Sequence, residues 1–210
     1  MTKRLLLILA LMLAPLGGSA VVASAQTAIA PPTVTASDRI MGRADAPVTV
    51  IEYASLVCSH CGDWHRTVYP EFKRQFIDTG RVRLVFRDLP TPPALVAARA
   101  AGIARCAAPN RFYDVIGAFF HGHEALFAGG PVPTWYASGV AVSGRTQAEI
   151  DACLADPATL AGVRASATGA MAAGVESTPT FFVNGRRVAD SSLTGLTAAI
   201  TPLLPPARRR

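Results

Sequence analysis

Several features that would place this chain in a common functional class are missing from its sequence. It has no glycine-rich loop of the kind that holds phosphates, and no segment resembles the sharp turn that carries a nucleophilic serine. Its basic residues are scattered and are not interleaved with aromatic residues, so nucleic-acid binding has little support. After residue 25, no apolar run reaches the length of about 20 residues that a membrane-spanning helix needs.

Lysine is scarce as well. Lys73 is the only lysine after residue 25, so arginine carries most of the positive charge. Three of the arginines form the tail 208–210, which we interpret as solvated. The positive charge therefore does not indicate a binding surface.

Residues 1–25 have the pattern of a secretory signal peptide. Lys3 and Arg4 give a positive start, residues 5–13 form an unbroken apolar run, and Ala23 and Ala25 are the small residues before a cleavage site. The apolar run is too short for a spanning helix, so we predict cleavage after Ala25, with an uncleaved anchor as the alternative. The absence of a cysteine near this site argues against a lipid anchor. We therefore expect a periplasmic or otherwise exported protein.

The rest of the chain predicts a single domain. Residues 26–44 are rich in Ala, Thr and Pro and predict a flexible segment. The folded domain is expected at 45–205, followed by a basic tail at 206–210. No internal repeat is visible.

The domain begins with a predicted strand, helix and strand. Residues 47–53 are β-branched and apolar, which is typical of a buried strand. One apolar face of the following helix is marked by Trp64, Val68, Phe72 and Phe76. Pro70 should kink or split this helix, and Gly80 should end it. Residues 81–87 predict a second strand, which completes a βαβ unit.

A helical block is predicted at about 94–173, and strands return after it. Its helices are expected at 94–107, 112–120, 146–154 and 158–173. Thr146 and Glu149 match a capping box, which supports the third of these helices. After the block, the sequence predicts a strand at 180–183, an Asn-Gly hairpin turn, a return strand at 186–188 and a helix at 193–204. The order βαβ, helical insert, ββα indicates an α/β fold.

The sequence Cys58-Ser59-His60-Cys61 lies between the first strand and the start of its helix. The amides and dipole of a helix N-terminus stabilise an anion, so the pKa of Cys58 should be lowered. His60 can add a positive charge or a hydrogen-bond donor. A stabilised thiolate favours the reduced pair and makes its disulfide more oxidising. Cys61, one turn further on, can resolve a mixed disulfide.

Two other interpretations of this cysteine pair stay open. The pair can be half of a zinc site, whose remaining ligands would come from Cys106, Cys153, His65, His121 and His123. It can also be a structural disulfide, although so small a ring restrains little of the chain. The sequence contains no second pair of cysteines at this spacing.

Cys106 and Cys153, 47 residues apart, both fall in the predicted helical block. An even number of cysteines in an exported protein favours disulfides, so we predict a structural disulfide between these two. Two buried free thiols are the alternative.

Two further features stand near the ends of the predicted strands. Glu52 is a charged residue in an apolar strand, which is costly unless the residue is paired or functional. Near Cys61 its carboxyl could take and return a proton, and the alternative is a solvent-facing residue on an edge strand. Thr178 and Pro179 directly precede the strand at 180–183. By itself, such a proline can simply mark a turn or a sheet edge.

Taken together, these motifs resemble the DsbA-like branch of the thioredoxin superfamily. The matching stretches are VTVIEYASLVCSHC at 48–61, RLVFRDLP at 83–90 and STPTFFVNG at 177–185. The middle of the chain matches only in its helical character and its position. The resemblance implies a thioredoxin fold with an inserted helical subdomain.

The resemblance also implies roles for individual residues. Cys58 would be the exposed nucleophile and Cys61 the buried resolving thiol. Pro179 would be a cis-proline beside the pair, and Thr178 would offer backbone groups to an extended substrate. Glu52 stands where family members keep a buried acid. The dipeptide Ser59-His60 departs from the Pro-His of the family's best-known strong oxidants.

From the resemblance we expect a thiol–disulfide oxidoreductase that introduces disulfide bonds into reduced exported proteins. It would need no small-molecule cofactor or metal, because the cysteine pair carries the electrons. A quinone-linked membrane oxidase of the DsbB type would reoxidise it. Two alternatives remain: a reductase or isomerase of the same fold, and a metal-binding or chaperone-like module without enzymatic activity.

Overall fold

The computed structural model describes residues 31–206, so the expected signal peptide 1–25 and the arginines at 208–210 lie outside the described residues. Its strands are β1 (Arg39–Met41), β2 (Val48–Ala54), β3 (Val82–Asp88), β4 (Thr180–Val183) and β5 (Arg186–Val188). Its α-helices are α1 (Ser59–Thr67), α2 (Tyr69–Phe72), α3 (Ala94–Cys106), α4 (Phe112–His121), α5 (His123–Phe127), α6 (Val132–Val142), α7 (Gln147–Ala155), α8 (Pro157–Ala172) and α9 (Leu193–Ile200). A π-helical turn at Lys73–Ile77 follows α2, and a 3₁₀ turn at Thr201–Leu203 follows α9.

The strands form one sheet in the order β1-β3-β2-β4-β5. Strands β2 and β3 run parallel, and the other neighbouring pairs are antiparallel. Glu52 on β2 is in register with Phe86 on β3 and with Phe181 on β4. The strand that carries Glu52 is therefore central in the sheet, and the alternative of an edge strand is wrong.

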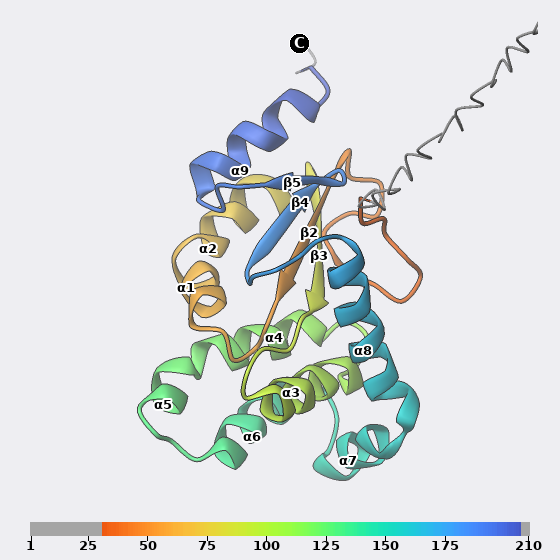
Figure 1. Ribbon diagram of the computed structural model, residues 1–210, viewed down its shortest axis with the longest axis vertical. Helices are drawn as coiled ribbons and strands as arrows, with labels where there is room; N and C mark the ends of the chain where they lie inside the picture. Colours follow the sequence, from red (N-terminus) through yellow and green to blue (C-terminus); the bar gives the residue numbers. More distant parts are fainter. Residues whose placement is uncertain (1–30, 207–210) are drawn as a thin grey trace, which may run out of the picture.

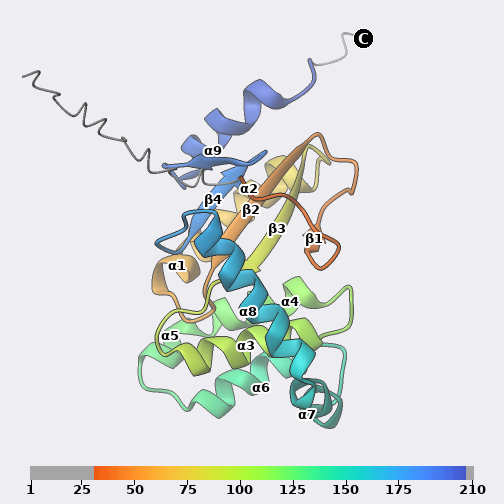
Figure 2. The same cartoon turned by 45° about the vertical axis from the view of Figure 1, so that its right-hand side comes forward.

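Helices cover both faces of the sheet, and the helical insert packs at one end of it (Figure 1). Helices α1, α2 and α9 lie on one face, where the apolar cluster includes Trp64, Phe72 and Leu196. Helix α8 crosses the other face, as Figure 2 shows, and its Ala170 packs in a cluster with Phe182. Helices α3 to α7 stand across the carboxyl ends of β2 and β3. The loop from β2 to α1 therefore lies where the sheet meets the insert.

Several local signals in the sequence correspond to the elements that form. The Thr146 side chain accepts a hydrogen bond from the Glu149 amide and Glu149 reaches back to the Thr146 amide, so the capping box begins α7. Asn184 and Gly185 have φ angles of 46° and 80°, which a tight hairpin turn between twisted strands requires. The expected α/β architecture with an inserted helical block is confirmed.

The prediction of a flexible segment at 26–44 is wrong for its later part. Residues Arg39–Met41 form β1 and pair with β3. Arg87 on β3 donates hydrogen bonds to the Asp38 carboxylate and to the Thr33 carbonyl, which ties this segment to the sheet. The composition of this segment does not predict the strand, because the three residues of β1 are held by their pairing with β3. The folded domain thus begins before residue 45.

The helix after the cysteine pair is split at the position expected from Pro70, since α1 ends at Thr67 and Pro70 lies in the first turn of α2. The prediction of the other helices needed correction at two places. The helix expected at 193–204 ends at Ile200, and Pro202, which lacks a backbone N–H, stands in the following 3₁₀ turn. Helices α5 and α6 were not predicted. No helix within residues 31–206 has both the length and the apolar character needed to cross a membrane.

Candidate active site

The two cysteines of the Cys-Ser-His-Cys motif lie at the N-terminus of α1. Cys58 is the N-cap residue, and its Sγ accepts a hydrogen bond from the Cys61 amide at 3.4 Å. Both cysteines are free thiols in this structure. Cys58 is half-buried, whereas Cys61 is completely buried against the helical insert. One thiol of the pair can thus be reached from outside and the other cannot.

The surroundings move the pKa values of the two thiols in opposite directions. A hydrogen bond with the Cys61 side chain, together with hydrogen bonds from the Thr178 side chain and from the Cys61 and His60 amides, outweighs burial and lowers the pKa of Cys58 to about 5. Burial raises the pKa of Cys61 far above that of a free cysteine, and the charges of Cys58 and Glu52 raise it further. At neutral pH, Cys58 is therefore a thiolate and Cys61 a thiol, which is the asymmetry that nucleophilic thiol chemistry requires.

Ser59 and His60 are exposed on the first turn of α1. His60 lowers the pKa of Cys58 through its backbone amide. The sequence suggested instead that its side chain would supply the charge or the donor.

The segment before β4 comes close to the nucleophile. The Thr178 carbonyl oxygen lies 3.5 Å from the Cys58 Sγ, and the Thr178–Pro179 peptide bond is cis. Pairing of β2 with β4, in which Tyr53 is opposite Thr180, brings these distant parts of the chain together. The structure thus joins the two sequence motifs in one site.

Glu52 is fully buried on β2 and is partnered by His65. The His65 Nε2 lies 3.0 Å from each of the two carboxylate oxygens of Glu52. The His65 ring stacks on Phe120 with centroids 4.2 Å apart. The sequence suggested His65 only as a zinc ligand. Its spacing of four residues from Cys61 does place it on the same face of α1, and that signal could have found it.

His123, at the start of α5, is a second residue whose role the sequence did not reveal. Its Nε2 donates a hydrogen bond of 2.7 Å to the carbonyl of Leu56, in the loop that leads to Cys58. The side chain is buried, and burial lowers its pKa. Its ring also lies directly against Gly62. No local pattern connects residue 123 with this loop, so only the tertiary structure shows the contact.

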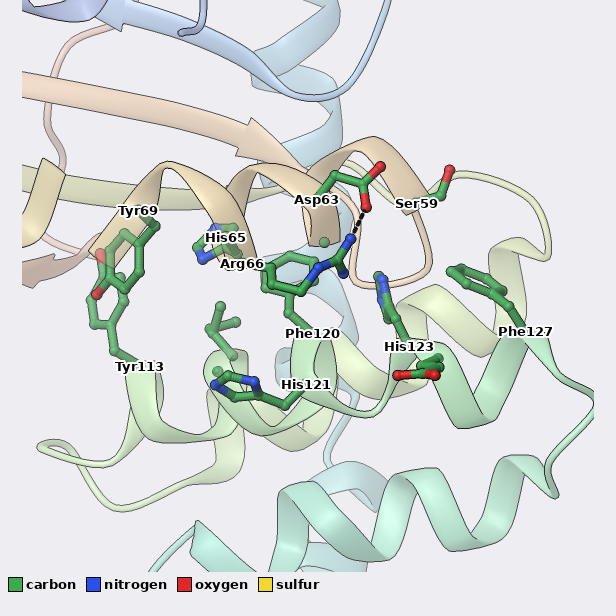
Figure 3. Close-up of a pocket in the computed structure, with 14 residues that line it drawn as sticks. Ser59, Asp63, His65, Arg66, Tyr69, Tyr113, Phe120, His121, His123 and Phe127 are labelled. Carbon is green, nitrogen blue, oxygen red and sulfur yellow. Dashed lines mark hydrogen bonds and ion pairs between the residues drawn. The ribbon is translucent and has the colours of Figure 1, made fainter. Parts of the chain in front are cut away.

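A pocket of about 450 Å³ opens between α1 and the helices α4 and α5 (Figure 3). Aromatic and histidine side chains form much of its wall, namely His65, Tyr69, Tyr113, Phe120, His121, His123 and Phe127. An ion pair between Asp63 and Arg66 stands on the α1 side, as the dashed line in Figure 3 shows. His65 is thus in contact both with this pocket and with the buried Glu52.

Cys106 and Cys153 are joined by a disulfide with a Cα–Cα distance of 5.9 Å. The bond connects the end of α3 with α7 inside the helical insert. Both sulfur atoms are therefore bonded to each other and are not available as the zinc ligands considered from the sequence.

Comparison with known proteins gives matches along most of the chain. A family model described as Thioredoxin matches residues 34–201. A Rickettsia bellii protein named "Putative protein-disulfide oxidoreductase" is 29% identical over 175 residues, which cover 78% of this chain and 63% of that protein. The Na(+)/H(+) antiporter NhaA 1 of Salinispora arenicola is 33% identical over 170 residues, which are 78% of this chain and 24% of the antiporter. The chain thus spans less than two thirds of these curated relatives.

Solved structures of related shape support the fold. The alpha-DsbA1 of Wolbachia pipientis is 25% identical, has a TM-score of 0.72, and is matched over 81% of this chain and 92% of its own. The BdbD of Bacillus subtilis has the same TM-score of 0.72 at 19% identity, over 83% of this chain and 97% of its own.

Proposed function

This chain belongs to the thioredoxin superfamily, in its DsbA-like branch, and from that premise we propose that it introduces disulfide bonds into other proteins through Cys58 and Cys61. One observation carries the proposal: the accessible thiol has a pKa of about 5, while its buried neighbour has a raised pKa. The lowered pKa of Cys58 stabilises the reduced pair, and a stabilised reduced pair makes the disulfide an oxidant.

The reaction follows from this geometry. A substrate thiolate attacks the Cys58 sulfur of the oxidised pair, the Cys58–Cys61 bond breaks, and Cys61 leaves with the electron pair and takes a proton. A second substrate thiolate then attacks the substrate sulfur of the mixed disulfide and releases Cys58. Cys58 leaves readily because its low pKa makes it a stable thiolate. Two electrons have moved from the substrate dithiol to the cysteine pair.

The segment beside Cys58 supports a role in substrate binding. The Thr178 carbonyl lies at the nucleophile, directly before β4, where an extended substrate segment could pair with the backbone. Glu52, buried near the pair, is proposed to exchange a proton with Cys61. Reduced polypeptides that contain several cysteines are the substrate class that this site suits.

The proposal includes export and a partner. The pattern of residues 1–25 supports an extracytoplasmic location, where disulfides persist. Each turnover leaves the pair reduced, so a second oxidant must act on it. We propose a membrane oxidase of the DsbB type for this step.

The experiment that tests the function is oxidative folding of a reduced, unfolded protein with the oxidised enzyme in stoichiometric amount. Wild type should convert client thiols to disulfides, and Cys58→Ser should abolish the conversion. Cys61→Ser cannot form the Cys58–Cys61 disulfide, so it should also fail to oxidise the reduced client. With a disulfide-bonded client, its Cys58 thiolate should displace one client thiolate and leave a mixed disulfide that persists, because no second enzyme thiol is present to resolve it. If Cys58→Ser retains the activity, the pair does not carry the reaction. If the wild type only reduces client disulfides, the enzyme is a reductase of the same fold.

A further inference from the structure

His123 of the helical insert contacts the chain on both sides of the nucleophile Cys58. Its Nε2 donates a hydrogen bond of 2.7 Å to the carbonyl of Leu56, two residues before Cys58. Its ring also lies against Gly62, four residues after Cys58, where an added Cβ atom would lie only 2.2 Å from the His123 Nδ1. One side chain of the insert thus touches both the loop that leads to the nucleophile and the first turn of α1 that follows it.

The His123 ring is neutral at neutral pH. Burial lowers its pKa, although the hydrogen bond to Leu56 and the charge of Cys58 act in the opposite direction. Besides Cys58, the charged groups that act on the ring include Arg66 and Asp63 of α1. His123 therefore acts through its hydrogen-bond donor and not as a counter-ion of the Cys58 thiolate.

The donor is what an imidazole adds at this position. A carbonyl oxygen can only accept, so Nε2 carries the hydrogen and Nδ1 is the bare acceptor of the ring. Within residues 31–206, the buried Nδ1 has no hydrogen-bond partner. An unpaired buried polar atom is costly, and an apolar ring would avoid that cost. The bond from Nε2 is the only hydrogen bond that the Leu56 carbonyl accepts in the described part of the chain.

The helical insert holds the His123 ring from several sides. The ring packs against Phe120 of α4 with centroids 5.2 Å apart and against Phe127 of α5 with centroids 4.9 Å apart. The centroid of Trp135 in α6 is 6.4 Å away. Figure 3 shows His123 between Phe120 and Phe127, facing the start of α1. This packing restricts the orientation of the ring, so the Nε2 donor has a fixed direction toward the loop.

We propose that His123 is a positioning residue for the nucleophile, which holds the Leu56 carbonyl and the first turn of α1 so that the helix amides point at the Cys58 sulfur. This role rests on the proposed function and deepens it, because it assigns part of the reactivity of Cys58 to the helical insert. His123 acts through the loop and the helix, and no hydrogen bond within the described residues joins it to either sulfur atom.

The position of the Cys58 sulfur depends on this part of the backbone. Its Sγ accepts a hydrogen bond from the Cys61 amide at 3.4 Å, and the Gly62 amide donates to the Cys58 carbonyl at 3.0 Å. Both bonds belong to the first turn of α1, where free amides stabilise an anion. Because such interactions weaken with distance, a shift of the loop relative to α1 would stabilise the thiolate less.

A different contact holds the residue before Leu56. The Ser55 Oγ accepts a hydrogen bond from the Thr91 amide at 3.2 Å and another from the Val57 amide at 3.4 Å. Ser55 is thereby fixed by the segment between β3 and α3. The Leu56 carbonyl takes no part in these bonds, so without His123 it would lose its partner while Ser55 kept its own.

The test measures the rate of Cys58 alkylation by iodoacetamide against pH in the reduced wild-type and variant proteins. His123→Phe keeps a flat ring beside Gly62 and removes the donor, whereas His123→Gln keeps a donor for the Leu56 carbonyl. We expect the half-maximal rate of His123→Phe to lie about 0.5 to 1 pH unit above that of the wild type, because the net loss of one hydrogen bond corresponds to a pKa change of this size. His123→Gln should lie closer to the wild type.

The equilibrium with glutathione gives a second readout. A less stabilised Cys58 thiolate disfavours the reduced pair, so the pair in His123→Phe should be about 3- to 10-fold harder to reduce at pH 7. His121→Phe is the matched control, since His121 is exposed in the wall of the same pocket and, within residues 31–206, no hydrogen bond joins it to the loop at 55–58. The control should keep the wild-type titration and equilibrium.

Urea unfolding at pH 7 separates positioning from a purely structural role. A contact that only stabilises the fold would lower the free energy of unfolding of the reduced and oxidised proteins equally in His123→Phe. It would also leave the titration of Cys58 unchanged. Positioning predicts instead that the reduced protein loses more stability than the oxidised one, because only the reduced protein has the thiolate.

The outcomes distinguish this role from the proposed function. A folded His123→Phe protein with the wild-type titration and glutathione equilibrium would overturn the role of His123 alone, and so would equal changes in His121→Phe. If His123→Phe does not fold, His123→Met, which also lacks the donor, is compared with His123→Gln. If neither donor-free variant folds, the residue is structural and the positioning role is overturned. A half-maximal rate near pH 9 in the wild type would defeat the proposed function first, and the role of His123 with it.

Discussion

The Sγ atom of Cys58 lies 3.5 Å from the carbonyl oxygen of Thr178, a residue 120 positions further along the chain. This contact exists because β4, which follows Pro179, pairs with β2, which leads to Cys58. The nucleophile thus faces a backbone segment that precedes an extended strand. Chemistry at the sulfur and recognition of a peptide backbone can therefore occur at the same place.

The titration of Cys58 is the first prediction. Its pKa is lowered to about 5, mainly by the hydrogen bond with the Cys61 side chain, so the thiolate should dominate at neutral pH. The rate of Cys58 alkylation by iodoacetamide in the reduced protein should therefore be half-maximal near pH 5 and level at higher pH. A half-maximal rate near 9, the ordinary value for a thiol, would contradict the electrostatics of the site.

The pH dependence of stability should differ between the reduced and oxidised proteins. A thiol whose pKa is lowered on folding stabilises the folded state fully above its unfolded pKa, and this contribution disappears as the pH falls through the folded value of about 5. The oxidised protein lacks the Cys58 thiol. The free energy of unfolding of the reduced protein, relative to the oxidised one, should thus rise from about pH 5 to about pH 8.

Guanidinium unfolding of the reduced and the oxidised protein between about pH 5 and about pH 8 measures the difference in their free energies of unfolding. The raised pKa of Cys61 adds no slope here, because both its folded and unfolded states keep the proton below the pKa of a free thiol. If the difference in free energy of unfolding between the reduced and oxidised proteins did not change with pH, folding would not change the ionisation of Cys58.

Gly62 should not tolerate a side chain. A methyl group at this position would overlap the His123 ring, which is held by its hydrogen bond to the Leu56 carbonyl. Gly62→Ala should lower the free energy of unfolding by about 1 to 3 kcal/mol, as overpacking does. Gly169→Ala on α8 is the matched control, since its methyl group would meet no atom within 4 Å. The free energy of unfolding of Gly169→Ala should be unchanged or up to about 1 kcal/mol higher, because alanine has a higher helix propensity than glycine.

Urea unfolding of both glycine variants gives the comparison. Equal stability of Gly62→Ala and Gly169→Ala would mean that the packing of α5 against α1 is looser than described.

The Cys106–Cys153 disulfide should stabilise the helical insert. It closes a separation of 47 residues, so replacing both cysteines by alanine should lower the free energy of unfolding by about 2 to 4 kcal/mol. The pH profile of Cys58 alkylation should remain unchanged. Intact mass after alkylation of the denatured, unreduced protein provides the direct check, and four modified thiols would rule the bond out.

Much of the fold could be predicted because its signals are local. The capping box of Thr146 and Glu149 and the turn at Asn184 and Gly185 depend only on neighbouring residues, and the structure has both. Strand β1 was missed because its three residues are held by pairing with β3. Helix α6 contains Ser138 and Gly139 and lacks a clear apolar stripe, so its sequence does not indicate the helix that its packing produces.

The candidate site also contains residues that the sequence predicts and residues that only the tertiary structure shows. The motif from Cys58 to Cys61 could be recognised from its position between a strand and a helix. The spacing of His65 from Cys61 indicates that both lie on one face of α1. The contact of His65 with Glu52 could not be predicted, because a strand residue and a helix residue 13 positions apart meet only when the sheet and α1 pack together. The contact of His123 with the loop before Cys58 crosses 67 positions and has no sequence pattern.

The equilibrium of the Cys58–Cys61 pair with glutathione tests the central claim most directly. Stabilisation of the Cys58 thiolate favours the reduced pair, so its potential should be less negative than about −200 mV, well above the value of about −270 mV for thioredoxin. The fraction of reduced protein at a series of glutathione ratios, measured by alkylation and mass spectrometry, gives this potential. A value near that of thioredoxin would contradict an oxidase and indicate a reductase, and the absence of a reversible couple would contradict the enzyme altogether.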